Sequence, residues 1–331
     1  MLGYIARRLV GAALVVVVIF TMVFLLFFYG PSDPGQAICN QQGRCTVERA
    51  AQINETLGFT KPVTEQYATF VNGIFTGREV TFGGTSIDCA APCFGASYIT
   101  RQPVSEILRE RFPATLSIAI GGAMIFFPLG VLLGTLAARR RGSATDRMLV
   151  GSSLLVSSIP YYIVCLLTYL YLVVQWGVFP DSEYYPLLDN PVKWFGGMLL
   201  PWLVLGLATS TAYARFSRGS MIESLSEDYV RTAKAKGLSE RRVTVRHALR
   251  AAIVPVVTIL GLDFAALLAG TVFTEQIFGI SGIGREALRA IFQQDFPVVL
   301  ATVVIASVFV VLANVVVDVL YSVIDPRVRL T

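Results

Sequence analysis

The residues best suited to act on another molecule lie in a polar, strongly basic segment, residues 227–255, which separates two long apolar runs. Ser224 and Glu227 have the spacing of a capping box, and Glu227 and Asp228 place negative charge in a first helical turn. Gly237 can adopt the left-handed conformation that ends a helix. The segment is therefore predicted to form two short helices with a break at Gly237.

The second short helix is predicted to begin at Ser239 and to carry two different faces. Such a helix would lie at a membrane surface and lead directly into the next apolar run. Its basic stripe comprises Arg242, Arg246 and Arg250, and its apolar stripe comprises Val245, Leu249 and Ile253.

Two interpretations of this segment assign different roles to its positive charge. Basic loops between membrane spans commonly act only as topology signals and contact nothing. The small residues Thr232, Ala233, Ala235 and Gly237 favour a second interpretation, because short side chains allow a helix to approach a protein groove closely. We therefore expect a docking helix for a cytoplasmic partner.

The types of residue that are missing exclude several classes of enzyme. The sequence has one histidine, His247, which excludes a multi-histidine metal site and disfavours a Ser-His protease. It contains no Gly-Lys dipeptide, so it has no P-loop with which to hold ATP phosphates. We expect neither a catalytic site nor a bound metal or cofactor in this chain.

The composition predicts an all-α polytopic membrane protein. Of its 331 residues, 54% are hydrophobic and 15% are charged, whereas soluble domains are about 25% charged. Each of six apolar runs is long enough to cross the hydrocarbon core as a helix. They are residues 9–29, 114–138, 148–176, 195–214, 251–273 and 298–323.

The distribution of basic residues predicts that both termini are cytoplasmic. With that orientation, seventeen of the 27 Lys and Arg residues fall on the inner side, as the positive-inside rule requires. The net charge of +5 is thereby explained by topology rather than by binding to nucleic acid. The long segment between the first two spans, residues 30–112, becomes an extracytoplasmic subdomain.

This outer segment contains four of the five cysteines. Two disulfides are expected on the oxidising side, through local pairs or a crossed arrangement, and the sequence leaves all three connectivities open. An amphipathic helix over residues 63–75 is expected to pack on the outer face of the bundle, and residues 77–98 are expected to form a loop. The disulfide candidates are Cys39, Cys45, Cys89 and Cys93.

The basic segment also carries a family resemblance. The run Y-V-R-T-A-K-A-K-G-L at 229–238, followed by R-H-A-L-R-A-A-I-V-P at 246–255, resembles the coupling loop of ABC importer permeases of the oligopeptide, dipeptide and nickel branch. The general permease signature has Glu-Ala-Ala before the glycine, and this sequence has Arg231, Thr232 and Ala233 instead. The peptide branch shows the same departure from the general signature. The P-A-T-L at 113–116 and the D-P-R at 325–327 also match.

The resemblance implies a non-enzymatic subunit of a peptide importer, multi-pass in the cell membrane and surrounded by lipid. Its expected partners are a second similar permease, two cytoplasmic ATPases that use ATP and Mg²⁺, and an extracytoplasmic binding protein. The implied parts are a first span at 1–29, the outer segment at 30–112, a permease core at 113–325 and a tail at 326–331. The coupling loop at 217–250 would contact the ATPases over residues 228–242.

The resemblance also assigns roles to single residues. Asp263 is a separate case, because an acid at membrane depth either lines a path or bonds to a neighbouring helix. An alternative function, an ATP-independent secondary transporter with Asp263 as a proton or cation carrier, therefore stays open. The implied coupling residues are Tyr229, Arg231, Thr232, Ala233, Ala235, Lys236, Gly237, Leu238 and His247, and the path or gate residues are Asp263, Gly270, Glu275 and Phe278.

Overall fold

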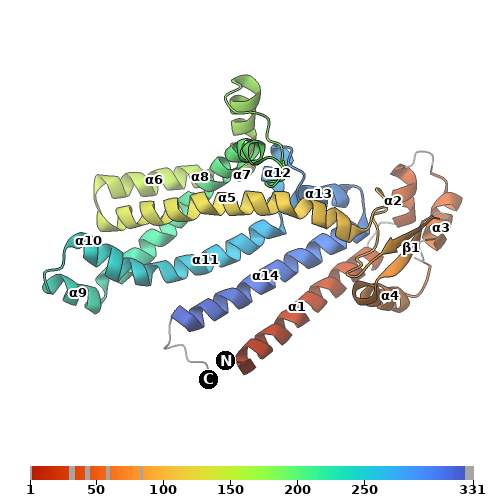
Figure 1. The fold of residues 1–331 in the computed structure, drawn as a ribbon, viewed down its shortest axis with the longest axis horizontal. Helices are drawn as coiled ribbons and strands as arrows, with labels where there is room; N and C mark the ends of the chain where they lie inside the picture. The colour runs from red at the N-terminus through yellow and green to blue at the C-terminus, as the bar shows by residue number, and fades with distance from the viewer. Residues whose placement is uncertain (1, 30–33, 42–44, 57–59, 83–84, 325–331) are drawn as a thin grey trace.

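The computed structural model describes residues 2–29, 34–41, 45–56, 60–82 and 85–324. Within these ranges five helices are long and apolar enough to cross a membrane, and one further candidate is a bent pair of helices. They form an elongated bundle, with a small disulfide-bearing subdomain at one end and two short helices at the other (Figure 1). The predicted tail at 326–331 lies outside the described residues.

Four of the continuous helices contain a predicted apolar run and extend beyond it, whereas the helix of the run predicted at 251–273 ends at Ala269, where Gly270 has a φ of +135°. The two longest have 36 residues each, about 54 Å at 1.5 Å per residue, whereas a hydrocarbon core is about 30 Å thick. Their polar ends therefore continue the helix outside the apolar layer. The five are α1 (Leu2–Tyr29), α5 (Val104–Arg139), α8 (Pro191–Ser226), α11 (Leu249–Ala269) and α14 (Phe296–Ile324).

Helices α5 and α8 pack against each other along most of their length. Gly121 lies against the ring of Trp202, and Gly134, further along α5, lies against the backbone of Ala214. Because these contacts advance together along both helices, α5 and α8 run in the same direction. A Cβ at Gly134 would lie 2.6 Å from the Ala214 carbonyl oxygen, so only glycine permits this approach.

The third predicted span is broken. Helices α6 (Ala144–Ser158) and α7 (Tyr161–Thr168) meet at an angle of 86° around Ile159 and Pro160, and α7 continues into a π-helical segment, η1 (Tyr169–Gln175). Ile159 has extended backbone angles, which the following proline favours. The sequence predicted one span at residues 148–176, and the structure corrects this to two helices.

Two arginines of α8 hold α6 in place. The Arg218 guanidinium donates two hydrogen bonds to the buried Asp146 carboxylate, at 2.6 and 2.8 Å. One turn earlier, Arg215 donates to the Ser153 carbonyl at 3.0 Å and to the Ser157 hydroxyl at 2.7 Å. The start and the end of α6 are thus both bonded to α8.

The disulfide-bearing subdomain contains a β-hairpin that the sequence analysis missed. Residues 77–98 were predicted to be loop, and the chain there is consequently not all-α. In the antiparallel pair Arg78 lies opposite Cys89, and Val80 lies opposite Ile87. Each strand has only five residues, too few for a clear alternating pattern. The elements are α2 (Pro34–Gln41), α3 (Val47–Thr56), α4 (Val63–Thr76), β1 (Arg78–Phe82) and β2 (Thr85–Cys89).

The disulfides are the two local ones among the three connectivities considered. Cys39 is bonded to Cys45 between α2 and α3, and Cys89 is bonded to Cys93 directly after β2. Cys165 is free and buried in α7. Each disulfide closes a loop of a few residues, so each fixes a turn rather than joining distant parts of the subdomain.

The subdomain packs on α1 and α14, as predicted for the amphipathic helix. Phe70 of α4 is buried against Phe20 and Phe24 of α1, close to Phe296 at the start of α14. Next to this cluster the Asp295 carboxylate accepts hydrogen bonds from the Ser97 hydroxyl and from the Tyr98 N–H. Burial raises the pKa of Asp295, although these hydrogen bonds act in the opposite direction.

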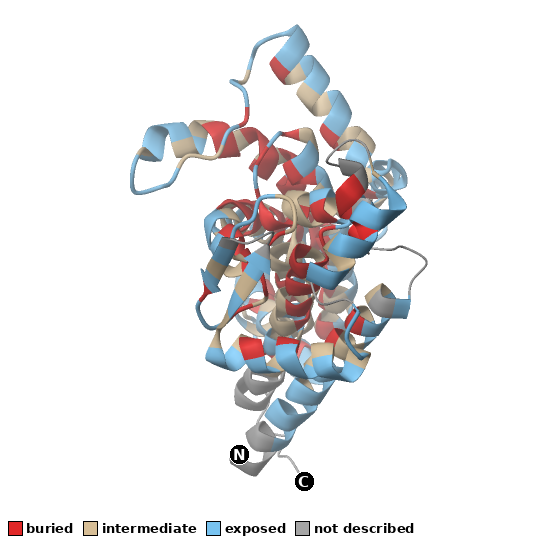
Figure 2. Ribbon diagram, turned by 90° about the vertical axis from the view of Figure 1, so that its right-hand side faces the viewer, coloured by how far each residue is buried: buried red, intermediate tan, exposed pale blue. Residues whose placement is uncertain are grey.

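Most buried residues lie along the middle of the molecule, and the outer helices expose their side chains (Figure 2). The exposed side chains of α1 include Leu14 and Leu26, which are 61% and 72% exposed. In water such a surface would be unfavourable, whereas lipid chains are as apolar as these residues. The burial pattern therefore fits a helical bundle surrounded by a bilayer.

Replacing Gly134 by Ala should destabilise the bundle by about 1–3 kcal/mol, because the new methyl group requires α5 and α8 to separate. The matched change Gly151→Ala in α6 adds a methyl group with no atom within 4 Å and should be neutral or stabilising by up to about 1 kcal/mol. Thermal unfolding in detergent would measure both. Equal effects at the two sites would contradict this account of the α5–α8 contact.

Candidate functional site

The first candidate site is the basic segment after α8. Glu227 has extended backbone angles and precedes α9 (Asp228–Ala235), so the predicted acidic start of the first short helix is present. The predicted capping role of Ser224 is wrong, because α8 continues through Ser226. The Ser224 hydroxyl instead donates to the Ala248 carbonyl at 2.8 Å and lies 3.1 Å from the Tyr229 hydroxyl.

Helix α9 has one buried face and one exposed face. Val230 and Ala233 are buried in a cluster with Met221 of α8 and Val243. The other face, with Thr232 and its neighbours, is exposed. Ala233 therefore packs α9 onto the bundle and does not contribute to an open surface. The exposed coupling candidates are Tyr229, Arg231, Thr232, Ala235, Lys236 and Gly237.

The predicted break at Gly237 is confirmed. Its φ of +74° is in the left-handed region, and its N–H donates to the Lys234 carbonyl at 2.9 Å. Leu238 is half-buried and returns the chain to the bundle, where its N–H donates to the Ala233 carbonyl. Ser239 then precedes the short helix α10 (Glu240–Arg242), as predicted.

The apolar stripe predicted for the second short helix is wrong at Val245, whereas the residues of the predicted basic stripe, Arg242, Arg246 and Arg250, are all exposed. A π-helical segment, η2 (Val243–Ala248), lies between α10 and α11. Its wider turn shifts the residues that follow, so Val243 and Ala248 are buried and Val245 is 56% exposed. His247 is half-buried within this segment. The Ser220 hydroxyl of α8 donates to the Ala252 carbonyl, which adds a second polar link between α8 and α11.

The second candidate site is at the opposite end of α5, around α12 (Val272–Ile277) and α13 (Ile283–Phe292). The Glu275 side chain is fully buried. One of its carboxylate oxygens accepts from the Thr115 hydroxyl at 2.8 Å and from the Thr271 N–H and hydroxyl, and the other accepts from the Arg285 N–H at 2.8 Å. This carboxylate therefore joins α12 to α5 and to α13.

Two glycines allow the backbone to fold around this carboxylate. Gly270 has a φ of +135°, and a Cβ there would lie 2.6 Å from the Gly284 Cα. A Cβ at Gly282 would lie 2.4 Å from the Glu275 carboxyl carbon. Phe278 is buried beside them, with its ring edge-on to that of Tyr169 at 5.8 Å. The structure thus brings Gly270, Glu275 and Phe278 together.

Asp263 lies apart from this cluster. Its carboxylate accepts a hydrogen bond from the Tyr213 hydroxyl of α8 at 2.8 Å. This is the structural alternative that the sequence analysis left open, a bond to a neighbouring helix. The bond joins α11 to α8 in the middle of the bundle.

Thr115 is a member of the site that was not predicted from the sequence. Its hydroxyl donates to Glu275 and also accepts from the Ile283 N–H at 2.8 Å. The threonine of the P-A-T-L motif was its only signal, because nothing local to residue 115 indicates a partner 160 residues away. Over the described parts of the chain, no three His, Cys, Asp or Glu side chains gather as a metal site requires.

Replacing Glu275 by Ala should loosen the α12–α13 segment, because it leaves the Thr271 and Arg285 N–H groups buried without an acceptor. Each such group costs about 1–3 kcal/mol. Amide hydrogen exchange over residues 271–285 should accelerate by roughly 100-fold. The control Asp181→Ala removes an exposed acid and should leave exchange unchanged. Unchanged protection in Glu275→Ala would show that the carboxylate does not hold this segment.

Comparisons with known proteins cover almost the whole chain. Residues 130–330 match the family model described as the inner membrane component of binding-protein-dependent transport systems, and residues 1–119 match the model of the N-terminal part of such components. A probable peptide ABC transporter permease of Sinorhizobium fredii is 34% identical, with 98% of this chain and 99% of that protein aligned.

Two further relatives are dipeptide transport system permease proteins named DppB. The one from Escherichia coli K12 is 34% identical, and the alignment covers 99% of each chain. The one from Lactococcus lactis is also 34% identical, and the alignment covers the full length of both chains.

Proposed function

Because this chain belongs to the family of inner membrane components of binding-protein-dependent transport systems, we propose that it is the permease subunit through which an ATP-driven importer carries peptides. It is a multi-pass protein of the cell membrane. The peptide cargo is supported by the relatives, which align over their whole length and are named as peptide or dipeptide permeases.

The proposed orientation places α9 and α10 in the cytoplasm and the disulfide-bearing subdomain outside. The excess of Lys and Arg near the α9 end supports this orientation through the positive-inside rule. The disulfides support it as well, since such bonds persist in oxidising surroundings. The broken α6–α7 pair then counts as one of six spans.

The exposed face of α9 is the observation on which the proposed coupling rests. Its small residues Thr232 and Ala235 would contact a cytoplasmic ATPase, while Val230 and Ala233 fix the same helix to the bundle. ATP and Mg²⁺ would be bound by two such ATPases, because this sequence has no P-loop. A second similar permease and an extracytoplasmic binding protein would complete the importer.

A continuous set of contacts can transmit movement of α9 through the bundle. Ser224 and Ser220 bond α8 to the start of α11, so a force on α9 would move both helices. Helix α8 packs closely on α5, and α5 contributes Thr115 to the buried Glu275 carboxylate at the far end. Docking of the ATPases would therefore change the packing around Glu275, which we place at the outer mouth of the path.

The alternative function, a secondary transporter with Asp263 as the ion carrier, is less well supported. The Asp263 carboxylate is bonded to Tyr213 and has a structural role that needs no ion. Uptake that stops when ATP is withdrawn, but continues after the proton gradient is collapsed, would be expected of the importer and not of a proton-driven carrier.

Replacing Ala235 by Glu should abolish binding of the ATPases and peptide uptake, because a long acidic side chain would separate the exposed face of α9 from its partner. Ala235 is a better probe than Ala233, whose burial means that substitution damages the fold itself. Co-purification of the ATPase subunits and ATP-driven uptake in proteoliposomes would measure the effect.

The control is Ala144→Glu, the same substitution at an exposed position in the other turn on the same side of the membrane. Ala144→Glu should leave both ATPase binding and uptake intact. The amount of Ala235→Glu protein inserted in the membrane should also be normal. Normal uptake by Ala235→Glu would refute the role of α9 in coupling.

A further inference from the structure

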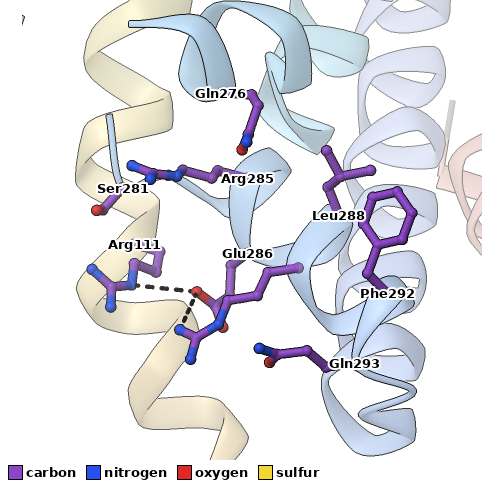
Figure 3. Close-up of a pocket in the computed structure, with 10 residues that line it drawn as sticks. Arg111, Gln276, Ser281, Arg285, Glu286, Leu288, Phe292 and Gln293 are labelled. Atoms are coloured by element: carbon purple, nitrogen blue, oxygen red, sulfur yellow. Dashed lines mark ion pairs between the residues drawn. The ribbon is translucent and has the colours of Figure 1, made fainter. Parts of the chain in front are cut away.

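A polar pocket of about 490 Å³ lies beside the buried Glu275 carboxylate, between α13 and the first turns of α5. Figure 3 shows the Arg111 and Glu286 side chains pointing toward one another across this pocket, with Arg285 next to them. Arg289 completes the charged set. The volume is in the range of sites for small ligands.

The pocket has more positive charge than its own acid can neutralise. Three arginines surround a single carboxylate, that of Glu286, which leaves an excess of two positive charges. The Glu286 carboxylate lies 3.9 Å from Arg111 Nε and 3.9 Å from an Arg289 terminal nitrogen, too far for hydrogen bonds. Arg111 Nε is buried and has no hydrogen-bond acceptor within the described part of the chain.

We propose that this pocket binds the terminal carboxylate of a peptide at the outer mouth of the path, an inference that rests on the peptide cargo proposed above. A guanidinium presents a planar fork of N–H donors that matches a carboxylate, and Arg111 and Arg289 have donors to spare. The side-chain amides of Gln276 and Gln293 are on the wall of the pocket and can bond to a peptide group.

The apolar part of the wall fits a peptide better than it fits a simple anion. Leu288 and Phe292 line the same pocket, and Phe292 is 80% exposed. A peptide side chain would cover this ring, while its carboxylate reaches the arginines.

Arg285 connects this pocket to the buried carboxylate. Its backbone N–H donates to Glu275 at 2.8 Å, and its guanidinium, on the pocket wall, donates to the Gly279 carbonyl at 2.7 Å. A ligand that draws this guanidinium away from Gly279 would pull on the turn between α12 and α13. Binding of a peptide carboxylate would therefore displace the segment that Glu275 holds together.

The test is photo-crosslinking of the dipeptide p-benzoylphenylalanyl-alanine and its C-terminal amide to the assembled importer in phosphatidylcholine nanodiscs. Mass spectrometry would quantify labelling of residues 276–293. The acid should label at least about tenfold more than the amide, which lacks the charge that the arginines bind. In Arg111→Gln/Arg289→Gln the labelling by the acid should fall to that of the amide.

The matched control is Arg109→Gln, which removes an exposed arginine from the same helix, outside the pocket. Arg109→Gln should keep the preference for the acid. Arg289→Lys should keep part of this preference, because lysine retains the positive charge. Basal ATPase activity of each complex would show that it is assembled. Equal labelling by acid and amide in the unaltered complex would overturn the proposal.

Two other molecules that could bind at this pocket would give different experimental results. If phosphatidylglycerol in the nanodisc abolishes labelling, the pocket belongs to an anionic lipid headgroup and the proposal is wrong. It is also wrong if the double variant labels normally but loses stimulation by the binding protein, since the arginines would then dock that protein. Lack of ATP-driven uptake of either dipeptide would overturn the peptide cargo itself, whereas uptake without a preference in labelling overturns the carboxylate pocket alone.

Discussion

The close contact between α5 and α8 is the constraint on which the rest of this structure depends. In lipid, apolar surface gains little from contact with another apolar surface, so helices associate through van der Waals packing and interhelical hydrogen bonds. Gly121, Gly130 and Gly134 place the backbone of α5 directly against α8. Since both helices are 36 residues long, one rigid pair reaches from the α9 end to the Glu275 end. Helices α6, α11 and α13 are positioned by their contacts with this pair, α14 packs mainly on α11, and α1 packs on α14.

The buried Glu275 carboxylate illustrates why the pair has to be rigid. A charged group without water is tolerated only when it is fully hydrogen-bonded, and one of the four donors to Glu275 is Thr115 of α5. A small shift of α5 along its axis would remove this donor and also the acceptor of the Ile283 N–H. The carboxylate is therefore sensitive to the position of α5, which makes the segment around it suitable as a gate.

The sequence predicts features that depend on local chemistry and misses those that depend on distant partners. Gly237 marks the left-handed turn because its own backbone preference determines it. Ala233 was assigned to the exposed face because its small size suits both docking and burial, and only the position of Val243 decides between them. The π-helical segment leaves Val245 of the predicted apolar stripe exposed, and no pattern of charge or hydrophobicity signals this segment. The partners of Glu275 come from three separate segments, so their assembly follows from the packing of the bundle.

The burial of Ala233 changes how the proposed coupling segment would work. If all its small residues were exposed, α9 would be a loosely attached helix, and movement of a bound ATPase would be absorbed by the loop. With Val230 and Ala233 packed on Met221 and Val243, α9 is held on both α8 and η2, and the bond from Ser224 to Ala248 links these two elements. The exposed face contains Thr232 and Ala235 between the basic residues Arg231 and Lys236. A partner that binds this face must act on the two elements beneath it, and this is the property that a coupling helix requires.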